Sequence, residues 1–464
     1  MSKVRDIQNT ITVNINELEE LHNIYDSLSP PKHSLHKEDI IHLINECVDY
    51  LYEFVVCNPK VYCNSDYNEV FENTITDFLD ATLEDYGSEC DIDELYDEVT
   101  YKTLKQFYSI IPKRSKKSNP VTILNTPEYR KYIKSKLDVI EEKDKTQPEQ
   151  RTPEWFQKRQ NLLSASSIWK AIDKQCYKNN LIYEKCCPID TGKYDRVNVN
   201  MPFHWGQKYE PVSQMYYEYK YDAIIREYGC IPHDTYVFLG ASPDGINIKE
   251  NSSRYGRMLE IKNIVNRDIT GKPKKEYWIQ TQLQMECCDL NECDFLETRF
   301  KEYDTKTDFD NDGTFLKTKE NKYKGIMVQF YHNNKPFYEY APFQATEEEF
   351  NAWYDKIMEK NSEKSWVKNI YWWLEEVSCV LIERNVQWFN AVLPELKETW
   401  DIIVKERKEG YEHRKPKKRL KKNTTQDVNN ENIKLIDILS KQLKKSTDEE
   451  EKDKKKTFII KVDI

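Results

Sequence analysis

The stretches that decide the fold of this chain are Ser242-Pro243-Asp244-Gly245 and Glu260-Ile261-Lys262. The first consists of residues that favour a turn between strands. The second ends a predicted strand, Arg257–Lys262, in which alternate residues share one face. Glu260 and Lys262 therefore point the same way, whereas Ile261 points into the core. The pattern predicts a turn carboxylate, Asp244, beside a carboxylate and an amine on the neighbouring strand.

This trio suits the hydrolysis of a phosphodiester. Mg²⁺ prefers a few carboxylates together with water and substrate oxygens, and a bound cation polarises the phosphoryl group and acidifies water. Asp244 and Glu260 would supply two ligands, and Ile261 would supply its backbone carbonyl. Lys262 would position the attacking water or stabilise developing negative charge. The plain alternative is that the first stretch is only a turn and the second only an exposed strand face.

The surrounding sequence predicts an α/β fold. Apolar periodicity and turn residues predict helices at Pro153–Arg159, near Ser164, after Trp205-Gly206 and at Glu276–Cys288, and strands at Ala223–Ile231, Tyr236–Gly240, Arg257–Lys262, Gly325–Tyr331 and Pro336–Tyr340.

Five segments are expected along the chain. They are an acidic helical domain (1–110), a connector (111–153), the α/β core (154–345), a Trp-rich helical region (346–408) and a Lys-rich, largely disordered tail (409–464).

Charge is distributed unevenly. The chain carries −10 in total, but residues 1–100 hold 23 Asp and Glu against five Lys and Arg, so the remainder sums to +8. The body can approach a polyanion, and the acidic head is expected to bind a partner or compete with DNA. No apolar run long enough for a bilayer and no signal sequence is visible, so we expect an intracellular protein with no membrane contact. Twelve cysteines in such a chain indicate reduced thiols.

With these motifs in place, the sequence resembles the PD-(D/E)XK nucleases, in particular the lambda-exonuclease or YqaJ viral recombinase family. The resemblance covers about residues 151–300 and rests on motifs in the family's order. These are Trp155, Arg159 and Ser164-Ala165-Ser166; Trp205-Gly206 with Glu210; the two stretches quoted first; and Tyr277, Gln280 and Gln282. The composition resembles giant-virus, mimivirus-type nucleases that are likened to CRISPR-adaptation exonucleases.

The resemblance implies a PD-(D/E)XK, restriction-endonuclease-like core, which is a mixed central sheet flanked by helices. It also implies a deoxyribonuclease that uses Mg²⁺, with Mn²⁺ as a substitute. It implies a 5′-to-3′ exonuclease on double-stranded DNA ends, acting in recombination, replication or defence, and a homo-oligomer. Arg159, Ser164 and Ser166 would bind the 5′-phosphate. Glu210 and Gln282 would join the catalytic set, Tyr277 and Gln280 would close the site, and Asp234 would be a further metal ligand.

Each of these residues also has a structural interpretation. Arg159 is equally a surface cation, Ser166 a helix cap, and the glutamines polar positions of an amphipathic helix. The long segment between Asp244 and Glu260 leaves the strand register open. An endonuclease on the same fold and a non-catalytic DNA-binding or assembly protein both remain alternatives.

Three further features of the sequence allow more than one interpretation. An iron–sulfur cluster is not expected, because Cys287, Cys288, Cys293 and Cys379 lack the Cys-x-x-Cys spacing of such sites. Packing is favoured over base stacking for the tryptophans of the C-terminal region, Trp353, Trp366, Trp372, Trp373, Trp388 and Trp400. The basic run at 414–422 is a nuclear address, a DNA tether or a solvated tail; otherwise we expect the host cytoplasm.

Overall fold

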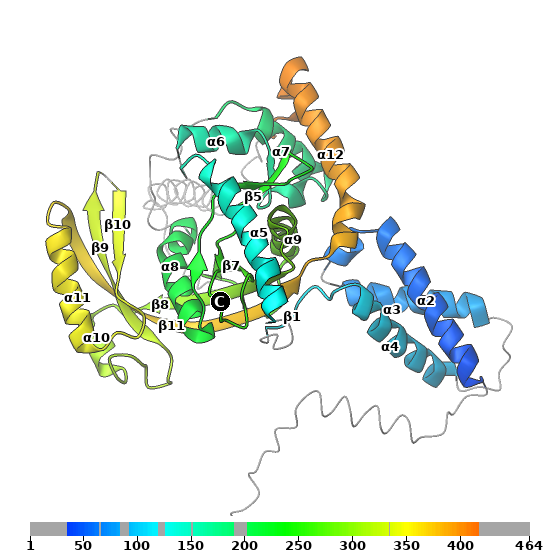
Figure 1. The fold of residues 1–464 in the computed structure, drawn as a ribbon, viewed down its shortest axis with the longest axis horizontal. Coiled ribbons are helices and arrows are strands. Elements are labelled where there is room, and N and C mark those ends of the chain that lie inside the picture. The colour runs from blue at the N-terminus through cyan, green and yellow to red at the C-terminus, as the bar shows by residue number, and fades with distance from the viewer. Residues whose placement is uncertain are drawn as a thin grey trace, which may run out of the picture. The chain divides into compact units, whose positions relative to one another are not determined.

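The computed structural model describes residues 35–64, 66–83, 92–118, 126–149, 152–189, 202–333 and 335–416 (Figure 1). By its contacts the chain divides into two units, Met1–Arg414 and Lys415–Ile464. All described helices and strands lie in the first unit. The expected disorder of the tail falls almost entirely outside the described residues. The five-segment division stays a prediction.

An eight-stranded mixed sheet organises the first unit. Its order is β10-β9-β11-β8-β7-β6-β3, with β1 paired to β11. Only β7 and β8 run parallel; the other pairs are antiparallel. The strands are β1 Lys116–Lys117, β3 Ile225–Arg226, β6 Gly245–Asn247, β7 Met258–Asn263, β8 Glu292–Glu302, β9 Lys324–His332, β10 Lys335–Tyr340 and β11 Ser365–Glu383.

Helices cover both faces of this sheet. Helix α8 (Pro202–Tyr221) packs on the face that carries Leu259 and Ile261. Helix α9 (Lys275–Cys288) packs on the opposite face, against Met258 and Phe295. The predicted α/β class, a mixed central sheet flanked by helices, is confirmed.

A second, three-stranded sheet lies beside α9. Strand β5 (Leu239–Ala241) pairs in parallel with β2 (Leu163–Ser164) and antiparallel with β4 (Ile231–Pro232). Its surroundings are α5 Pro127–Lys145, α6 Pro153–Gln160, the 3-10 turn Ile168–Lys170 and α7 Gln175–Cys186. The short strands replace the longer ones expected at Ala223–Ile231 and Tyr236–Gly240. The helix expected near Ser164 is instead a strand end followed by the 3-10 turn.

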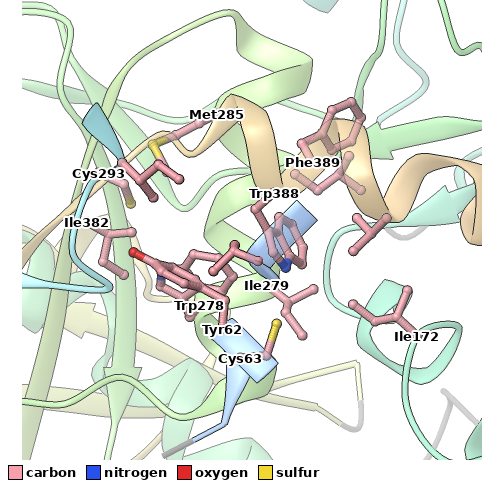
Figure 2. Close-up of a cluster of buried hydrophobic side chains, with 14 of the residues drawn as sticks. Tyr62, Cys63, Ile172, Trp278, Ile279, Met285, Cys293, Ile382, Trp388 and Phe389 are labelled. Carbon is pink, nitrogen blue, oxygen red and sulfur yellow. The ribbon is translucent and has the colours of Figure 1, made fainter. Parts of the chain in front are cut away.

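The N-terminal helices are α2 (Lys37–Cys57), α3 (Tyr67–Leu83) and α4 (Ile92–Ile110). They share one apolar core with the sheet and α9. Figure 2 shows the junction, where the Tyr62 ring lies 5.4 Å from that of Trp278. Trp278 in turn meets Trp388 edge-on at 4.8 Å, which ties the C-terminal helix α12 (Val386–Glu409) to the same core.

The sequence predicts a helical C-terminal region at 346–408, but the structure contains a long strand there. Between α11 (Glu347–Lys360) and α12, the 19 residues of β11 form the longest strand described. Register shifts between Trp366 and Lys368 and between Leu374 and Glu376 interrupt its alternation. The period-2 signal of a strand is lost at such bulges, which explains the wrong assignment.

The hairpin β9–β10, the short helix α10 (Lys306–Asn311) and α11 stand to one side of the core in Figure 1, joined to it by β11. None of the helices within the described residues is long and apolar enough to cross a membrane.

Candidate active site

The turn carboxylate and the strand carboxylate do meet. Asp244 lies between β5 and β6, and its Oδ2 accepts a hydrogen bond of 2.7 Å from the backbone N–H of Ile261. Because the N–H and C=O of one strand residue point to the same side, the Ile261 carbonyl is directed toward Asp244 as well. Gly245 is needed here, since a Cβ would lie 2.1 Å from the Ile225 side chain.

Glu260 is fully buried and held on both oxygens. Its Oε1 accepts from the Lys262 ammonium and, at 2.6 Å, from Gln280 Nε2. Its Oε2 accepts from Gln284 Nε2 at 2.7 Å. Three donors thus fix one carboxylate, which is the arrangement expected of a preorganised ligand.

The electrostatics of the pair are unfavourable without a cation. Although Asp244 keeps some accessible surface, burial raises its pKa well above the usual range, and the charges of Glu260 and Glu210 raise it further. Burial lowers the pKa of Lys262, but Glu260 and Asp244 outweigh this effect and the net shift is upward. Three carboxylates near one ammonium leave a negative site.

A hard divalent cation fits this donor set. Asp244, Glu260 and the Ile261 carbonyl are oxygen donors, and Mg²⁺ takes its remaining ligands from water and substrate. Within the residues that the structure describes, no three His, Cys, Asp or Glu side chains are grouped so as to hold a metal by themselves. Two carboxylates and one carbonyl leave coordination positions of such an ion for water and substrate oxygens.

A group of hydroxyls and a guanidinium lies against this pair. Arg159, in the last turn of α6, donates to Ser242 Oγ at 3.5 Å and to Ser166 Oγ at 3.4 Å. Ser164 Oγ lies 3.5 Å from Ser166 Oγ. The Arg159 guanidinium stacks 4.7 Å from the Trp155 ring centroid. These long contacts bind Arg159 weakly, so its paired donors remain available to an anion.

Helix α9 presents only one of the two glutamines expected from the sequence, Gln280. Gln282 faces away and bridges the end of β11 to α12, donating to Glu383 O at 3.0 Å and accepting from Asn385 N at 2.7 Å. Gln284, which the sequence reasoning missed, reaches Glu260 and also donates to Ser242 O at 3.1 Å. With 3.6 residues per turn, positions 280 and 284 share a face and 282 does not; that spacing was the available signal.

Of the remaining candidates, two lie near the carboxylates and one does not. Tyr277 packs its ring 5.1 Å from Lys262 Nζ. Glu210 lies on the exposed side of α8, near enough to act on Asp244. Asp234 points elsewhere: its side chain is 67% exposed and pairs with Lys143 at 2.8 Å.

The cysteines considered for a cluster are packed into the core. Cys287, Cys288 and Cys293 are buried, and burial raises the pKa of each thiol.

Comparison with known protein families indicates the class of protein to which this geometry corresponds. Residues 154–291 match the model of the YqaJ-like viral recombinase domain. All the motifs that carried the resemblance, from Trp155 to Gln282, fall inside this range. The predicted family resemblance is confirmed for this part of the chain.

A relative and two solved structures are also similar. An uncharacterized protein, R354, of Acanthamoeba polyphaga mimivirus is 30% identical over 315 residues, which are 59% of this chain and 56% of the relative. The chain thus spans about half the length of the curated relative it matches. The alkaline exonuclease LHK-Exo of Laribacter hongkongensis, free and with dAMP, is 20% and 21% identical, covering 56% of this chain and 95% of that one at a TM-score of 0.32.

The unfavourable electrostatics of Asp244 give a prediction that needs no activity assay. Asp244→Asn keeps an acceptor for the Ile261 N–H but removes the buried charge, so it should raise the melting temperature, by about 1 °C for each kcal/mol relieved in a unit as large as Met1–Arg414. Because the Asp244 pKa is raised in the fold, the gain should be present at pH 7 and shrink as the pH falls. Calorimetry checks this.

Asp234→Asn, on an exposed and paired carboxylate, is the control and should change the melting temperature little. Added Mn²⁺ should stabilise the wild type more than Asp244→Asn. Lower stability of Asp244→Asn at neutral pH would contradict the account.

Proposed function

We propose that this chain is a metal-dependent DNA nuclease that removes nucleotides 5′-to-3′ from double-stranded ends. The observation that carries the proposal is the Arg159–Ser242 contact. It joins a group of donors suited to a terminal phosphate to the turn that presents Asp244. A 5′-phosphate held by Arg159, Ser164 and Ser166 would leave the next phosphodiester beside the carboxylates.

The roles of the chain's residues follow from their contacts. Asp244, Glu260 and the Ile261 carbonyl would hold Mg²⁺, or Mn²⁺ in its place. When bound, the ion would polarise the phosphoryl oxygen and acidify water. Lys262 is fixed by Glu260 and flanked by Tyr277, so its ammonium would orient the attacking water and stabilise charge on the phosphate.

Two neighbouring groups would complete the set. Glu210 would adjust the field at the ion's outer edge. Gln280 and Gln284 donate to opposite oxygens of Glu260 and would keep that carboxylate aimed.

Other parts of the proposal concern the whole protein. We propose a homo-oligomer, action in viral recombination, replication or defence in the host cytoplasm, and a partner for the acidic N-terminal helices. Deleting those helices is a poor test of any role, because Tyr62 covers Trp278 of α9 and the deletion would expose it.

The first prediction of the proposed function concerns turnover. Lys262→Met and Glu260→Gln should each lower hydrolysis of a linear duplex by about 10³-fold or more. Lys262 would stabilise the negative charge of the transition state, and Glu260 would hold the metal ion. DNA affinity should change little. End-labelled linear duplexes in Mg²⁺, Mn²⁺ and EDTA measure this, with covalently closed circles alongside.

Cleavage of closed circles at a comparable rate would replace the exonuclease with an endonuclease. Wild-type protein no faster than these variants in Mn²⁺ would leave a non-catalytic DNA-binding protein.

The second prediction concerns the DNA end. Arg159→Ala should remove the preference for a 5′-phosphate over a 5′-hydroxyl end, a loss of about tenfold or more given the strength of a charge-assisted bidentate contact. Lys158→Ala is the matched control, because this neighbouring cation instead bonds the Gln147 side chain. If Arg159→Ala kept the same preference for a 5′-phosphate end as Lys158→Ala, Arg159 would be excluded as the phosphate ligand.

The third prediction separates two glutamines of one helix. Gln284→Leu should lower the single-turnover rate by about tenfold or more, since it deprives Glu260 of a donor. Both substitutions leave buried partners unpaired, so each should reduce the free energy of unfolding by about 1–3 kcal/mol. Gln282→Leu should nevertheless retain its rate per folded molecule, because Gln282 does not contact Glu260. Rates and denaturation curves of both variants decide, and the reverse pattern would restore Gln282 to the site.

A further inference from the structure

One of the six tryptophans of the C-terminal region does not pack into the protein. Trp353, Trp372, Trp373, Trp388 and Trp400 are buried or half-buried, as expected for packing residues, whereas Trp366 is 50% exposed. It lies at the outer end of β11, on the arm formed by β9, β10, α11 and that end of β11.

Trp366 belongs to a row of aromatic residues across three strands. Phe330 of β9 is the register partner of both Trp366 on β11 and Phe337 on β10. Directly opposed side chains lie on one face of a sheet, so the three rings share the face covered by α11. Phe330 is buried against this helix, whereas Trp366 and Phe337 are exposed.

The exposed rings are held in place. The Trp366 indole N–H donates to Asn369 Oδ1 at 3.3 Å, which fixes the edge of the ring and leaves its faces accessible. The Lys364 ammonium lies 4.3 Å from the Phe337 ring centroid. A fixed ring binds a flat partner with less loss of entropy than a mobile one.

Charge changes sign along the arm. Residues 347–359 of α11 hold five acidic and one basic residue, a net −4. The tip, residues 331–340 and 360–369, holds four lysines and two glutamates, a net +2. Lys335, at the end of the hairpin, forms no ion pair with the residues that the structure describes.

We propose that this tip, Trp366 and Phe337 with Lys335 and Lys364, binds single-stranded nucleic acid by stacking a base on the Trp366 ring beside these cations. Fixed aromatic faces beside cations are what unpaired bases and their phosphates require, and a duplex hides its base faces.

The position of the arm relates the tip to the candidate active site. β10 ends at Tyr340, whose hydroxyl donates to the Lys208 carbonyl of α8, next to Glu210. Phe337 is three residues from Tyr340 on the same strand, roughly 10 Å away. The inference rests on the proposed function for the origin of its ligand: the single strand is the one left when the other is hydrolysed.

Full-length protein in EDTA tests the inference without hydrolysis. Fluorescence anisotropy would compare oligo-dT of about 20 nucleotides with a blunt duplex. Trp366→Ala should weaken oligo-dT binding by about fivefold or more and leave duplex binding unchanged. Tyr101→Ala, an aromatic of similar exposure on α4, is the matched control and should change neither. Changing Lys335 and Lys364 to Gln should reduce the salt slope by roughly 0.7 for each phosphate that these lysines neutralise.

Wild-type affinity of Trp366→Ala for oligo-dT would overturn the inference. So would a lower mass of that variant in sedimentation with unchanged affinity, which would assign the tip to a contact between copies. Hydrolysis in Mn²⁺ is measured separately. If the wild type does not cleave DNA but Trp366→Ala still loses oligo-dT binding, the arm inference stands and the nuclease proposal fails.

Discussion

The hydrogen bond from the Ile261 N–H to Asp244 is the constraint on which the candidate site depends. Strands β6 and β7 share only two register pairs, so this bond adds a third tie between the turn and the strand. It sets Asp244 beside Glu260 and turns the Ile261 carbonyl toward the same place. Because β7 is flanked by β6 and by the parallel β8, Glu260 lies on an inner strand of the sheet, and Asp244 lies on the turn that leads directly into β6. A ligand set fixed to strands in this way needs little reorganisation when a cation binds.

Burying this set has an energetic cost, and the surroundings limit it. An unpaired buried carboxylate is strongly disfavoured, yet Glu260 receives Lys262, Gln280 and Gln284. Asp244 is held chiefly by the Ile261 N–H, and burial together with the neighbouring Glu260 charge raises its pKa well above the usual range. The imbalance is informative. A structural ion-pair cluster would be neutral. The buried group of Arg254, Arg257 and Asp294 is an example, because Glu292 brings its net charge to zero. The residual negative charge at Asp244 is what a cation site retains.

The sequence was sufficient for the parts that depend on local patterns. The turn at Asp244, the face shared by Glu260 and Lys262, and helix α9 all follow from short-range periodicity. What failed depends on longer-range structure. The choice between Gln282 and Gln284 requires knowing which face of α9 meets β7, because the helix is buried on nearly every side and offers no polar face as a guide. Strand β11 was taken for helix since two bulges break its alternation, and β8 was not foreseen at all.

Segments outside the matched domain also support the site. Helix α9 carries Gln280 and Gln284 on one face and Trp278 on another, where Tyr62 and Trp388 enclose it. Tyr62 precedes residues 154–291 and Trp388 follows them, so the orientation of both glutamines depends on chain that the family model does not cover. Arg407 of α12 acts similarly on α6, donating to the Gln160 carbonyl directly after Arg159. The added helices are therefore braces for the two elements that aim the candidate ligands. A fragment limited to residues 154–291 would keep every motif and lose the packing that orients them.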